Sequence, residues 1–448
     1  MLRRLSAEKA PWLFEKNLQV LLSALSEGKE EARVVGGAIR NTLLGEPIRD
    51  IDIATTTLPE ITIARARRFG FNILPTGIDF GTVTVGTNEG RGYEITTLRA
   101  DLETDGRYAR VCFGRNWKTD AKRRDFTINA LYVDKDGIIY DYVAGLQDIE
   151  DHVLRFIGSA EERIREDCLR ILRFFRFYAW IGDSHCPDSQ EIKAIARLKD
   201  SLYQLSAERT WSELRKLLAA PDPLHSLLWM HNIGILAIVL PEIEKQWMES
   251  IHALIETEKS LAWQADPLLR LATLVPSDTV RIKALANRLK FSNAEKNRLI
   301  QLSVSNLIAT DFSEIQLKKC IYYEGRQPVL DRLRLSIANA YATTLRDNCI
   351  FTGAGNYVSL EKLARNWKIP TFPISGRDMM TMGFNQGPGI GKMLNILEDM
   401  WIKSMFQWNK NSLLAHFEEE YKTPGRALVQ EEHRCNEMNG FLRSSSTK

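Results

Sequence analysis

The fold of the first part of the chain is decided by the stretch GGAIRNTLLGEPIRDID, residues 36–52. Ala38–Leu44 predicts a short helix that ends at Gly45, a typical C-terminal cap. The last residues of the stretch alternate polar and apolar side chains, which predicts a strand with Asp50 and Asp52 on one face. Two carboxylates one pleat apart, beside glycines and an arginine, suit a divalent metal and a phosphate. By itself this pattern is more often a solvated sheet face, so the rest of the chain decides between the two.

The composition predicts a globular, cytoplasmic protein that does not span a membrane. The chain has 448 residues, of which 44% are apolar and 26% charged, and its net charge is +3. This length predicts two to four domains. Six cysteines are scattered with no Cys-x-x-Cys pair, which predicts reduced thiols and argues against a zinc site. No apolar run reaches the length of a membrane span, and the composition leaves the oligomeric state open.

A further carboxylate is predicted on a later strand. Residues 81–86 (GTVTVG) and 92–98 (GYEITTL) both have the alternation and the β-branched content of strands, and the turn-forming residues 88–90 between them predict a hairpin. Within the second strand, Glu94 is either a third carboxylate beside the two aspartates or a surface residue opposite a cross-strand neighbour.

Residues 100–122 are polar and charged with little periodicity, which predicts a mobile, substrate-facing loop or a solvated connection. The motif RRDFTINAL follows at residues 123–131. Because guanidinium groups match the geometry of phosphate oxygens, Arg123 and Arg124 suit a triphosphate. The alternative is a salt-bridged helix start.

The chain changes character after about residue 150, where strand signals give way to amphipathic helical patterns that continue to about residue 420. The sequence therefore predicts an α+β protein, with an α/β head followed by an all-α remainder.

An acidic residue and three arginines recur at every third position of the helical stretch EDCLRILRFFRFY, residues 166–178. They are Asp167, Arg170, Arg173 and Arg176. Each step of three falls about 60° short of a helical circuit, so the first three are expected to fan across one face. This face is either salt-bridged or base-reading, because an Asp–Arg pair matches the donor and acceptor pattern of cytosine and adenine and mismatches that of guanine and uracil.

Taken together, the motifs resemble the tRNA nucleotidyltransferase family, the CCA-adding enzymes of the bacterial and eukaryotic class. That class also contains bacterial poly(A) polymerases and separate CC-adding and A-adding enzymes. The resemblance covers roughly residues 33–250. It rests on five motifs in family order: Gly36-Gly37-x-x-Arg40 with Asp50-x-Asp52, Gly81-Thr-Val-Thr-Val85, Arg123-Arg124-Asp125 with Asn129, Glu166-Asp167-x-x-Arg170-x-x-Arg173, and Glu208-Arg209-x-x-x-Glu213-Leu214-x-Lys216.

The resemblance implies a role for each matching residue. Asp50 and Asp52 would bind two Mg²⁺ ions, and Glu94 would be a catalytic residue that helps to activate the primer hydroxyl. Nucleotide binding is implied for Gly36, Gly37, Arg40, Arg124, Asp167, Arg170, Arg173 and Arg176. The first four would hold the triphosphate, and the last four would form or support a template that reads the base.

The resemblance also implies an architecture and an activity. The parts would be a nucleotidyltransferase head at residues 1–150, a helical neck with the template helix at 151–220, a helical body at 221–330, a tRNA-binding helical tail at 331–425 and a disordered C-terminus at 426–448. The activity would be addition of C, C and A to the 3′ end of tRNA from CTP and ATP, with release of pyrophosphate. The acceptor stem and T-arm of the tRNA would be bound, and residues 100–115 would switch the enzyme from CTP to ATP.

Two alternatives stay open. One is a CC-adding, A-adding or poly(A) polymerase activity of the same family. The other is a non-catalytic RNA-binding protein that has kept the fold.

Overall fold

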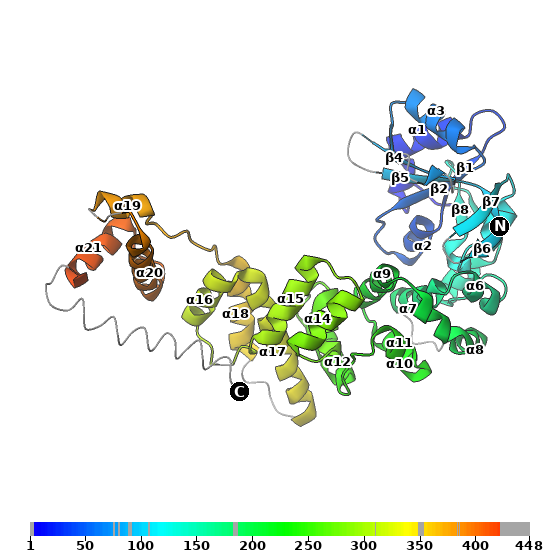
Figure 1. The fold of residues 1–448 in the computed structure, drawn as a ribbon. Helices are drawn as coiled ribbons and strands as arrows, with labels where there is room; N and C mark the ends of the chain where they lie inside the picture. Colours follow the sequence, from blue (N-terminus) through cyan, green and yellow to red (C-terminus); the bar gives the residue numbers. More distant parts are fainter. Residues whose placement is uncertain are drawn as a thin grey trace. The chain divides into compact units, whose positions relative to one another are not determined.

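The computed structural model describes residues 4–74, 77–78, 81–87, 92–105, 108–181, 187–309, 311–347, 354–382, 384 and 386–421, with the backbone alone at 100–105, 108–111, 342–347, 354–355 and 420–421. The chain forms two compact units, Met1–Val304 and Ser305–Lys448 (Figure 1). The predicted turn at 88–90 and the predicted disordered end at 426–448 lie outside the described residues.

The first unit begins with the α/β head, whose described strands form a seven-stranded sheet in the order β3-β4-β5-β2-β1-β8-β9. The strands of this sheet are β1 (Ala32–Val35), β2 (Ile51–Thr55), β3 (Asn72–Leu74), β4 (Thr82–Gly86), β5 (Gly92–Thr97), β8 (Leu131–Val133) and β9 (Ile139–Asp141). β2 and β5 pair in parallel, whereas the other neighbours pair in antiparallel fashion. The central pair therefore joins two strands that are far apart in the sequence.

The alternation of side chains explains why these segments form strands. In β4, Val83 and Val85 are buried while the threonines beside them are half-buried. In β5, Tyr93 and Ile95 are buried while Glu94 is exposed. Since successive side chains of a strand point to opposite faces, the buried set packs into the head and the polar set lies on the other face. The antiparallel pairing of β4 with β5 confirms the predicted hairpin partners.

The helices of the head pack on this sheet. α1 and α3 contact each other, with α1 against β1 and α3 against β3, β4 and β5, and α2 contacts β1, β2 and β8. The helices of the first unit are α1 (Lys16–Leu25), α2 (Gly37–Leu44), α3 (Pro59–Arg68), α4 (Trp117–Lys122), α5 (Gly145–Glu150), α6 (Ala160–Glu166), α7 (Leu169–Ile181), α8 (Ser189–Leu198), α9 (Ala207–Leu218), α10 (Leu224–Ile233), α11 (Ile235–Val239), α12 (Trp247–Ser260), α13 (Pro267–Leu274), α14 (Thr279–Arg288) and α15 (Asn293–Val304). Short 3₁₀ turns lie at η1 (Pro11–Phe14), η3 (Thr127–Asn129) and η4 (Lys199–Gln204).

The region predicted as a loop or connection, residues 100–122, contains regular structure. β6 (Arg99–Asp105) and β7 (Tyr108–Phe113) form an antiparallel two-stranded sheet that is separate from the main one. α4 follows directly, and the side chain of Asn116 caps it by accepting hydrogen bonds from the backbone N–H groups of Lys118 (3.0 Å) and Thr119 (3.2 Å). The high charge of the region concealed both the hairpin and this cap signal.

The remainder of the chain is helical, as predicted, and no strand follows β9 among the described residues. The second unit contains α16 (Glu314–Glu324), α17 (Arg326–Asp347), α18 (Ala354–Asn366), α19 (Gly376–Thr381), α20 (Pro388–Lys403) and α21 (Lys410–Tyr421). The last three helices share a core that includes Met379, Leu397, Trp401 and Phe417. Within the part of the chain that the structure describes, no helix is both long enough and apolar enough to cross a membrane.

Glu191 joins α8 to the end of the head. Its side chain is 8% exposed, and Oε1 accepts a hydrogen bond from the backbone N–H of Phe156 (3.2 Å). Oε2 is buried and has no hydrogen-bond partner among the described atoms. Burial raises the pKa of Glu191 to about 7 from its ordinary value of 4.5. The folded protein therefore retains a proton over a pH range in which the unfolded chain has released it.

We predict that Glu191→Gln stabilises the protein at alkaline pH and has little effect at acidic pH. The stability that comes from protonated Glu191 is complete below pH 4.5 and is lost as the pH rises through 7. The loss in the free energy of unfolding is up to about 3 kcal/mol. Glutamine stays neutral, so denaturant unfolding should show a more stable variant at about pH 8 and nearly equal stabilities at about pH 5.

The matched control for this prediction is Glu162→Gln, because Glu162 is an exposed glutamate on the neighbouring helix α6. It should leave the pH profile unchanged. Equal stability of Glu191→Gln and the unmodified protein at about pH 8 would contradict the prediction.

Candidate active site

A cleft of about 230 Å³ opens on the polar face of the sheet. It is lined by two carboxylates and three arginines, together with smaller residues of the strands: Val35, Asp52, Ile53, Thr82, Glu94, Thr96, Arg99, Arg123 and Arg124. Charged groups of both signs therefore converge on one concave surface, which is the arrangement expected of a site that binds a charged ligand.

The two carboxylates are neighbours because β2 and β5 run parallel. Asp52 on β2 is directly in register with Glu94 on β5, and paired residues of adjacent strands project from the same face. The prediction that Glu94 lies beside Asp52 on a neighbouring strand agrees with this register.

Asp50 differs from the prediction, which placed it in the strand on the same face as Asp52. β2 begins at Ile51, so Asp50 is an exposed residue that comes just before the strand. The preceding Pro47–Arg49 segment is irregular, and the predicted alternation of exposed and buried residues still extends from Asp50 to Ile53. Asp50 is nevertheless close enough to contribute to the electrostatics of Asp52.

The carboxylates repel each other electrostatically. Partial removal from water, the charge of Glu94 and the charge of Asp50 raise the pKa of Asp52 to about 6, whereas Arg124 opposes the rise. A bound divalent cation relieves such repulsion, so the donor set fits a hard metal ion. No group of three or more His, Cys, Asp or Glu side chains in the described residues is arranged to hold a metal by itself. Mg²⁺ takes one or two protein carboxylates and completes its shell with water and substrate phosphates.

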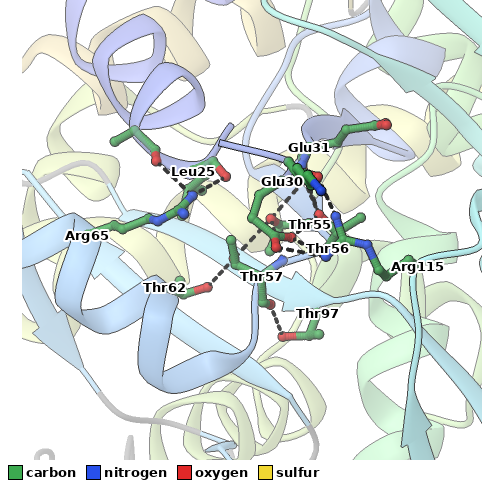
Figure 2. Close-up of polar contacts among 12 residues, drawn as sticks. Leu25, Glu30, Glu31, Thr55, Thr56, Thr57, Thr62, Arg65, Thr97 and Arg115 are labelled. Atoms are coloured by element: carbon green, nitrogen blue, oxygen red, sulfur yellow. Dashed lines mark hydrogen bonds and ion pairs between the residues drawn. The ribbon is translucent and has the colours of Figure 1, made fainter. Parts of the chain in front are cut away.

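A threonine network fixes the two strands just beyond their carboxylates (Figure 2). The Thr55 hydroxyl donates to the backbone oxygen of Glu31 (2.9 Å) and is hydrogen-bonded to the Thr57 hydroxyl (3.0 Å). Thr97 of β5 donates to the backbone oxygen of Thr57 (2.8 Å), and Thr57 is also bonded to Thr62 of α3 (2.7 Å). These buried bonds hold β2 and β5 together and so fix the relative positions of the two acids.

The β6–β7 hairpin is rooted beside the cleft. Arg99, its first residue, lines the cleft. At the other end, Arg115 donates to both carboxylate oxygens of Glu30 (2.7 and 2.9 Å), as Figure 2 shows. Glu30 also accepts a hydrogen bond from Thr56, the residue after β2. The exit of the hairpin is therefore attached to the same network that fixes the carboxylate strands.

The glycines of the first motif allow the sharp turn between β1 and α2. Gly36 has a φ of +77°, and a Cβ atom there would lie 3.3 Å from the backbone oxygen of Asn129. Its N–H donates to the backbone oxygen of Leu131 (3.0 Å). Gly37 begins α2. The turn therefore requires glycine at position 36.

Arg40 lies at the junction of the head and α7, and it does not line the cleft. Its guanidinium donates to Asn41 Oδ1 (2.8 and 3.1 Å) and to Asn129, and its Cζ lies 4.7 Å from the ring centroid of Phe177. Burial and the nearby arginines lower the pKa of Arg40 to about 10, despite Asp125. Its role in triphosphate binding stays a prediction.

The helical stretch 166–178 is broken at its start, contrary to the prediction of one continuous face. α6 ends at Glu166 and α7 begins at Leu169, so Asp167 lies between the two helices. Its Oδ1 accepts from the Leu169 N–H (3.1 Å), which gives it the position of a helix cap, and its Oδ2 accepts from Arg209 of α9 (2.7 Å). The capping ability of Asp overrode the helical spacing.

Arg170 connects this break to the cleft. It donates to Glu166 Oε2 (2.7 Å), to the backbone oxygen of Arg163 (3.0 Å) and to the backbone oxygen of Arg123 (3.3 Å). Arg123 lines the cleft. Arg170 therefore contacts a residue that lines the cleft, and the place of Asp167 in base reading stays a prediction.

Arg173 and Arg176 hold the junction together. Arg173 donates to Asp125 (2.7 Å), and Arg176 is paired with Glu213 of α9. Both guanidinium groups face the ring of Phe177, at 5.4 and 3.9 Å from its centroid. Burial alone would raise the pKa of Asp125, but Arg173 and the hydrogen bond from Asn129 lower it to about 2. Both arginines thus support the segment that carries Asp167 and Arg170.

Several cleft residues were not among the predicted site residues. Thr82 and Thr96 are directly paired on β4 and β5. Because Thr96 lies two residues after Glu94, it shares the face of Glu94, and the predicted pairing of the two strands could have placed both threonines in the cleft. Arg99 follows the end of β5, and its position in the cleft depends on the hairpin that the sequence did not predict. Asp120, which holds Arg123 and Arg124, had no signal beyond its spacing from them.

Two family models match the chain. They are the Poly A polymerase head domain at residues 32–155 and the probable RNA and SrmB-binding site of polymerase A at residues 187–246.

Curated relatives match the chain over most of its length. The mitochondrial CCA tRNA nucleotidyltransferase 1 of Danio rerio is 34% identical and the match covers 90% of each chain. The Homo sapiens protein of the same name is also 34% identical, with 90% of each chain covered. The CCA-adding enzyme of Streptococcus sanguinis is 31% identical, with 92% of this chain and 99% of its own length covered.

Solved structures share the fold. The Bacillus stearothermophilus CCA-adding enzyme in complex with CTP superposes with a TM-score of 0.63 at 24% identity, covering 91% of this chain and 98% of its own. The Thermotoga maritima CCA-adding enzyme complexed with tRNA superposes with a TM-score of 0.57 at 19% identity, covering 93% and 97%.

We predict that Asp52→Asn and Glu94→Gln each weaken the binding of Mn²⁺, used as a paramagnetic probe for Mg²⁺. Asp52→Asn removes a carboxylate assigned to the metal, and Glu94→Gln removes the negative charge in register beside it. The dissociation constant measured by electron paramagnetic resonance should rise by at least about tenfold, a loss seen even for outer-shell partners of metals. Glu60→Gln on α3, an exposed glutamate of the head that does not line the cleft, is the control. Unchanged Mn²⁺ affinity in both cleft variants would mean that the cation binds elsewhere.

Proposed function

The chain belongs to the family of CCA-adding tRNA nucleotidyltransferases, and we propose that its cleft adds C, C and A to the 3′ end of tRNA from CTP and ATP, with release of pyrophosphate. The single observation that carries this assignment to the cleft is the register of Asp52 with Glu94, in a hollow that also contains Arg123 and Arg124. Nucleotidyl transfer needs carboxylates for the metal and cations for the triphosphate, and both are present on one surface.

We assign the metal to Asp50 and Asp52. When bound there, two Mg²⁺ ions supply the charge that favours ionisation of the attacking 3′-hydroxyl and that stabilises the departing pyrophosphate. Glu94, in register with Asp52, accepts a hydrogen bond from that hydroxyl and orients it. The proton of the hydroxyl passes to the Glu94 carboxylate as the new bond from the hydroxyl oxygen to the α-phosphorus forms and the bond to pyrophosphate breaks.

The arginines bind the phosphates. Arg123 and Arg124 each present a planar fork of N–H donors, which matches two oxygens of a phosphate group. Arg99 enters the same cleft from the base of the β6–β7 hairpin. Gly36 in the turn before α2, and Gly37 and Arg40 in the first turn of α2, are assigned to the triphosphate site by the family resemblance, although Arg40 does not line the cleft.

Asp167 and Arg170 choose the base in this proposal. A carboxylate accepts from the exocyclic amino group of cytosine or adenine, and a guanidinium donates to the adjacent ring nitrogen. Each oxygen of Asp167 is engaged by one donor in the structure, from Leu169 and from Arg209. A carboxylate oxygen has capacity for a second donor, so the two existing bonds orient Asp167 and leave capacity for a base. Arg173 and Arg176 support this template from the junction.

The β6–β7 hairpin favours addition of all three nucleotides over CC addition alone. The resemblance implies a switching element at residues 100–115, and the described backbone there is an ordered hairpin whose first residue lines the cleft. A-adding and poly(A)-adding activities use the same head chemistry, and product length on a sequencing gel distinguishes them. A non-catalytic RNA-binding protein would be expected to lack the acids, whereas Asp50, Asp52 and Glu94 are all present.

The cytoplasm is the proposed location, on the evidence of scattered cysteines without a paired motif. The vertebrate relatives are mitochondrial by name, so mitochondria are the alternative compartment.

The direct test supplies tRNA that lacks CCA with each nucleoside triphosphate separately, and then with CTP and ATP together. Incorporation of C from CTP, and of A only after C, is expected in the presence of Mg²⁺. Asp50→Ala and Asp52→Ala should abolish transfer and leave tRNA binding, measured by gel retardation, largely intact. Failure of the unmodified protein to incorporate C contradicts the function, and retained incorporation in both variants contradicts the metal assignment.

We predict that Asp167→Ala relaxes base choice. Removing the carboxylate removes the acceptor that favours an exocyclic amino group, and a good pair of this kind contributes about 1–3 kcal/mol of discrimination. The ratio of kcat/KM for CTP to that for UTP should therefore fall by about tenfold or more. Arg165→Ala, an exposed arginine on α6, is the control. Unchanged discrimination against UTP and GTP would refute the template.

A further inference from the structure

We propose that Asp120 is a positioning residue that separates the charges of the cleft: it holds Arg123 and Arg124 in place for phosphate and keeps them away from the carboxylates that bind the cation. The inference rests on the function proposed for the cleft. It assigns a role in nucleotide and metal binding to a buried residue that touches neither.

Asp120 is fully engaged by these arginines and by one tyrosine. It lies on α4 and is 1% exposed. Oδ1 accepts from Arg123 through Nε (2.8 Å) and Nη2 (2.6 Å). Oδ2 accepts from Arg124 through Nε (3.2 Å) and Nη2 (3.0 Å), and from the Tyr132 hydroxyl (2.8 Å). A carboxylate has about four lone-pair sites, so these bonds saturate Asp120.

The bonds leave part of each guanidinium available. Arginine has five N–H donors in a fixed fork, and Asp120 receives two from each arginine. Arg123 and Arg124 both line the cleft, and their remaining N–H donors therefore point in fixed directions. Because the fork is rigid, fixing one edge also fixes the orientation of the other.

A row of paired residues shows how Asp120 is placed relative to the acids. Tyr132, Val35, Asp52 and Glu94 are consecutively in register across β8, β1, β2 and β5. Neighbouring strands are about 4.8 Å apart, so the Tyr132 and Asp52 backbones are separated by about two such spacings. All four side chains project from one face of the sheet.

α4 covers one half of this row and leaves the other half open. Trp117 and Ala121 of α4 pack in one buried cluster with Val35 and Tyr132, and the Trp117 and Tyr132 rings meet edge to face at 5.2 Å. Asp52 and Glu94, at the other end of the row, are exposed in the cleft. Asp120 is hydrogen-bonded to Tyr132 at the end of the row that α4 covers. It also holds Arg123 and Arg124, which line the cleft with Asp52 and Glu94 at the open end.

The alternative partners of the arginines are the two acids that line the cleft, Asp52 and Glu94. Arg123 and Arg124 line the same cleft as Asp52 and Glu94, so groups of opposite charge share one concave surface. Without the Asp120 carboxylate, the described acids that line the cleft with Arg123 and Arg124 are Asp52 and Glu94. An arginine paired with Asp52 would occupy oxygens that the cation needs, and one paired with Glu94 would occupy the acceptor proposed for the primer hydroxyl. In both cases the arginine would lose donors that the phosphates need.

The test compares Asp120→Asn with the unmodified protein. The amide keeps the size of the side chain but removes the charge and replaces one acceptor with a donor. We expect the KM for CTP to rise by about tenfold or more, as for loss of charge-assisted bonds. The Mn²⁺ dissociation constant, measured by electron paramagnetic resonance without nucleotide, should rise severalfold, and the Mg²⁺ concentration for half-maximal rate should rise with it.

A second variant keeps the proposal testable if Asp120→Asn does not fold. Tyr132→Phe removes only the hydroxyl that donates to Asp120 and accepts from Arg124 Nε (3.1 Å). It should shift the KM for CTP and the Mn²⁺ affinity in the same direction and by less. The proposal is overturned if either folded variant loses stability or kcat while both the KM for CTP and the Mn²⁺ affinity stay unchanged.

Asp148→Asn is the matched control. Asp148 is also a buried aspartate of the head, 2% exposed and bonded to an arginine, Arg155 (2.6 Å), and to Thr127 (2.6 Å), but none of these residues lines the cleft. Its replacement should lower stability without changing the KM or the Mn²⁺ affinity. If the unmodified protein incorporates no CTP, the proposed function fails; if it is active and the Asp120 variant matches it in both measurements, only the present inference fails.

Discussion

The site depends on the parallel pairing of β2 with β5. Every other described neighbour pair in the sheet is antiparallel, and this one register brings Asp52 and Glu94 side by side although 42 positions separate them in the chain. Carboxylates so arranged repel each other, and removal from water together with this repulsion raises the pKa of Asp52. The threonine network beyond the two acids holds the strands together against this repulsion. A cation that binds beside the carboxylates relieves the repulsion, and this relief favours its binding.

A second constraint is the distribution of positive charge around these acids. Asp120 holds Arg123 and Arg124 of the cleft, while Asp125 holds Arg173 and Glu213 holds Arg176 at the junction. Each of these acids thus orients at least one guanidinium, and we have proposed that the two held by Asp120 are kept from the cleft carboxylates. Buried charges that lack partners are costly, so this pairing both stabilises the junction of head and helices and preserves the charge pattern that nucleotide transfer requires.

Periodicity and motif chemistry predicted the parts of the site that lie on regular strands. Glu94 was placed beside Asp52 because alternation fixes which side chains of a strand share a face. Asp167 was placed wrongly on a continuous helix, since spacing alone does not reveal a helix that stops and is capped again. The high charge of residues 100–122 gave no strand or helix pattern, so the β6–β7 hairpin and α4 were not predicted. The positions of Arg99 and Asp120 depend on these elements and were therefore not predicted either. The role of Asp120 depends on contacts made after folding, which no local pattern contains.

The central claim is that the acids of β2 and β5 and the arginines after α4 bind one nucleoside triphosphate with its metal. A crystal structure of the protein with CTP and Mg²⁺ tests it most directly. The account predicts a metal ion about 2.1 Å from a carboxylate oxygen of Asp52, with phosphate oxygens within hydrogen-bond distance of Arg123 or Arg124. A triphosphate bound outside the cleft, or a metal held without Asp52, would contradict it.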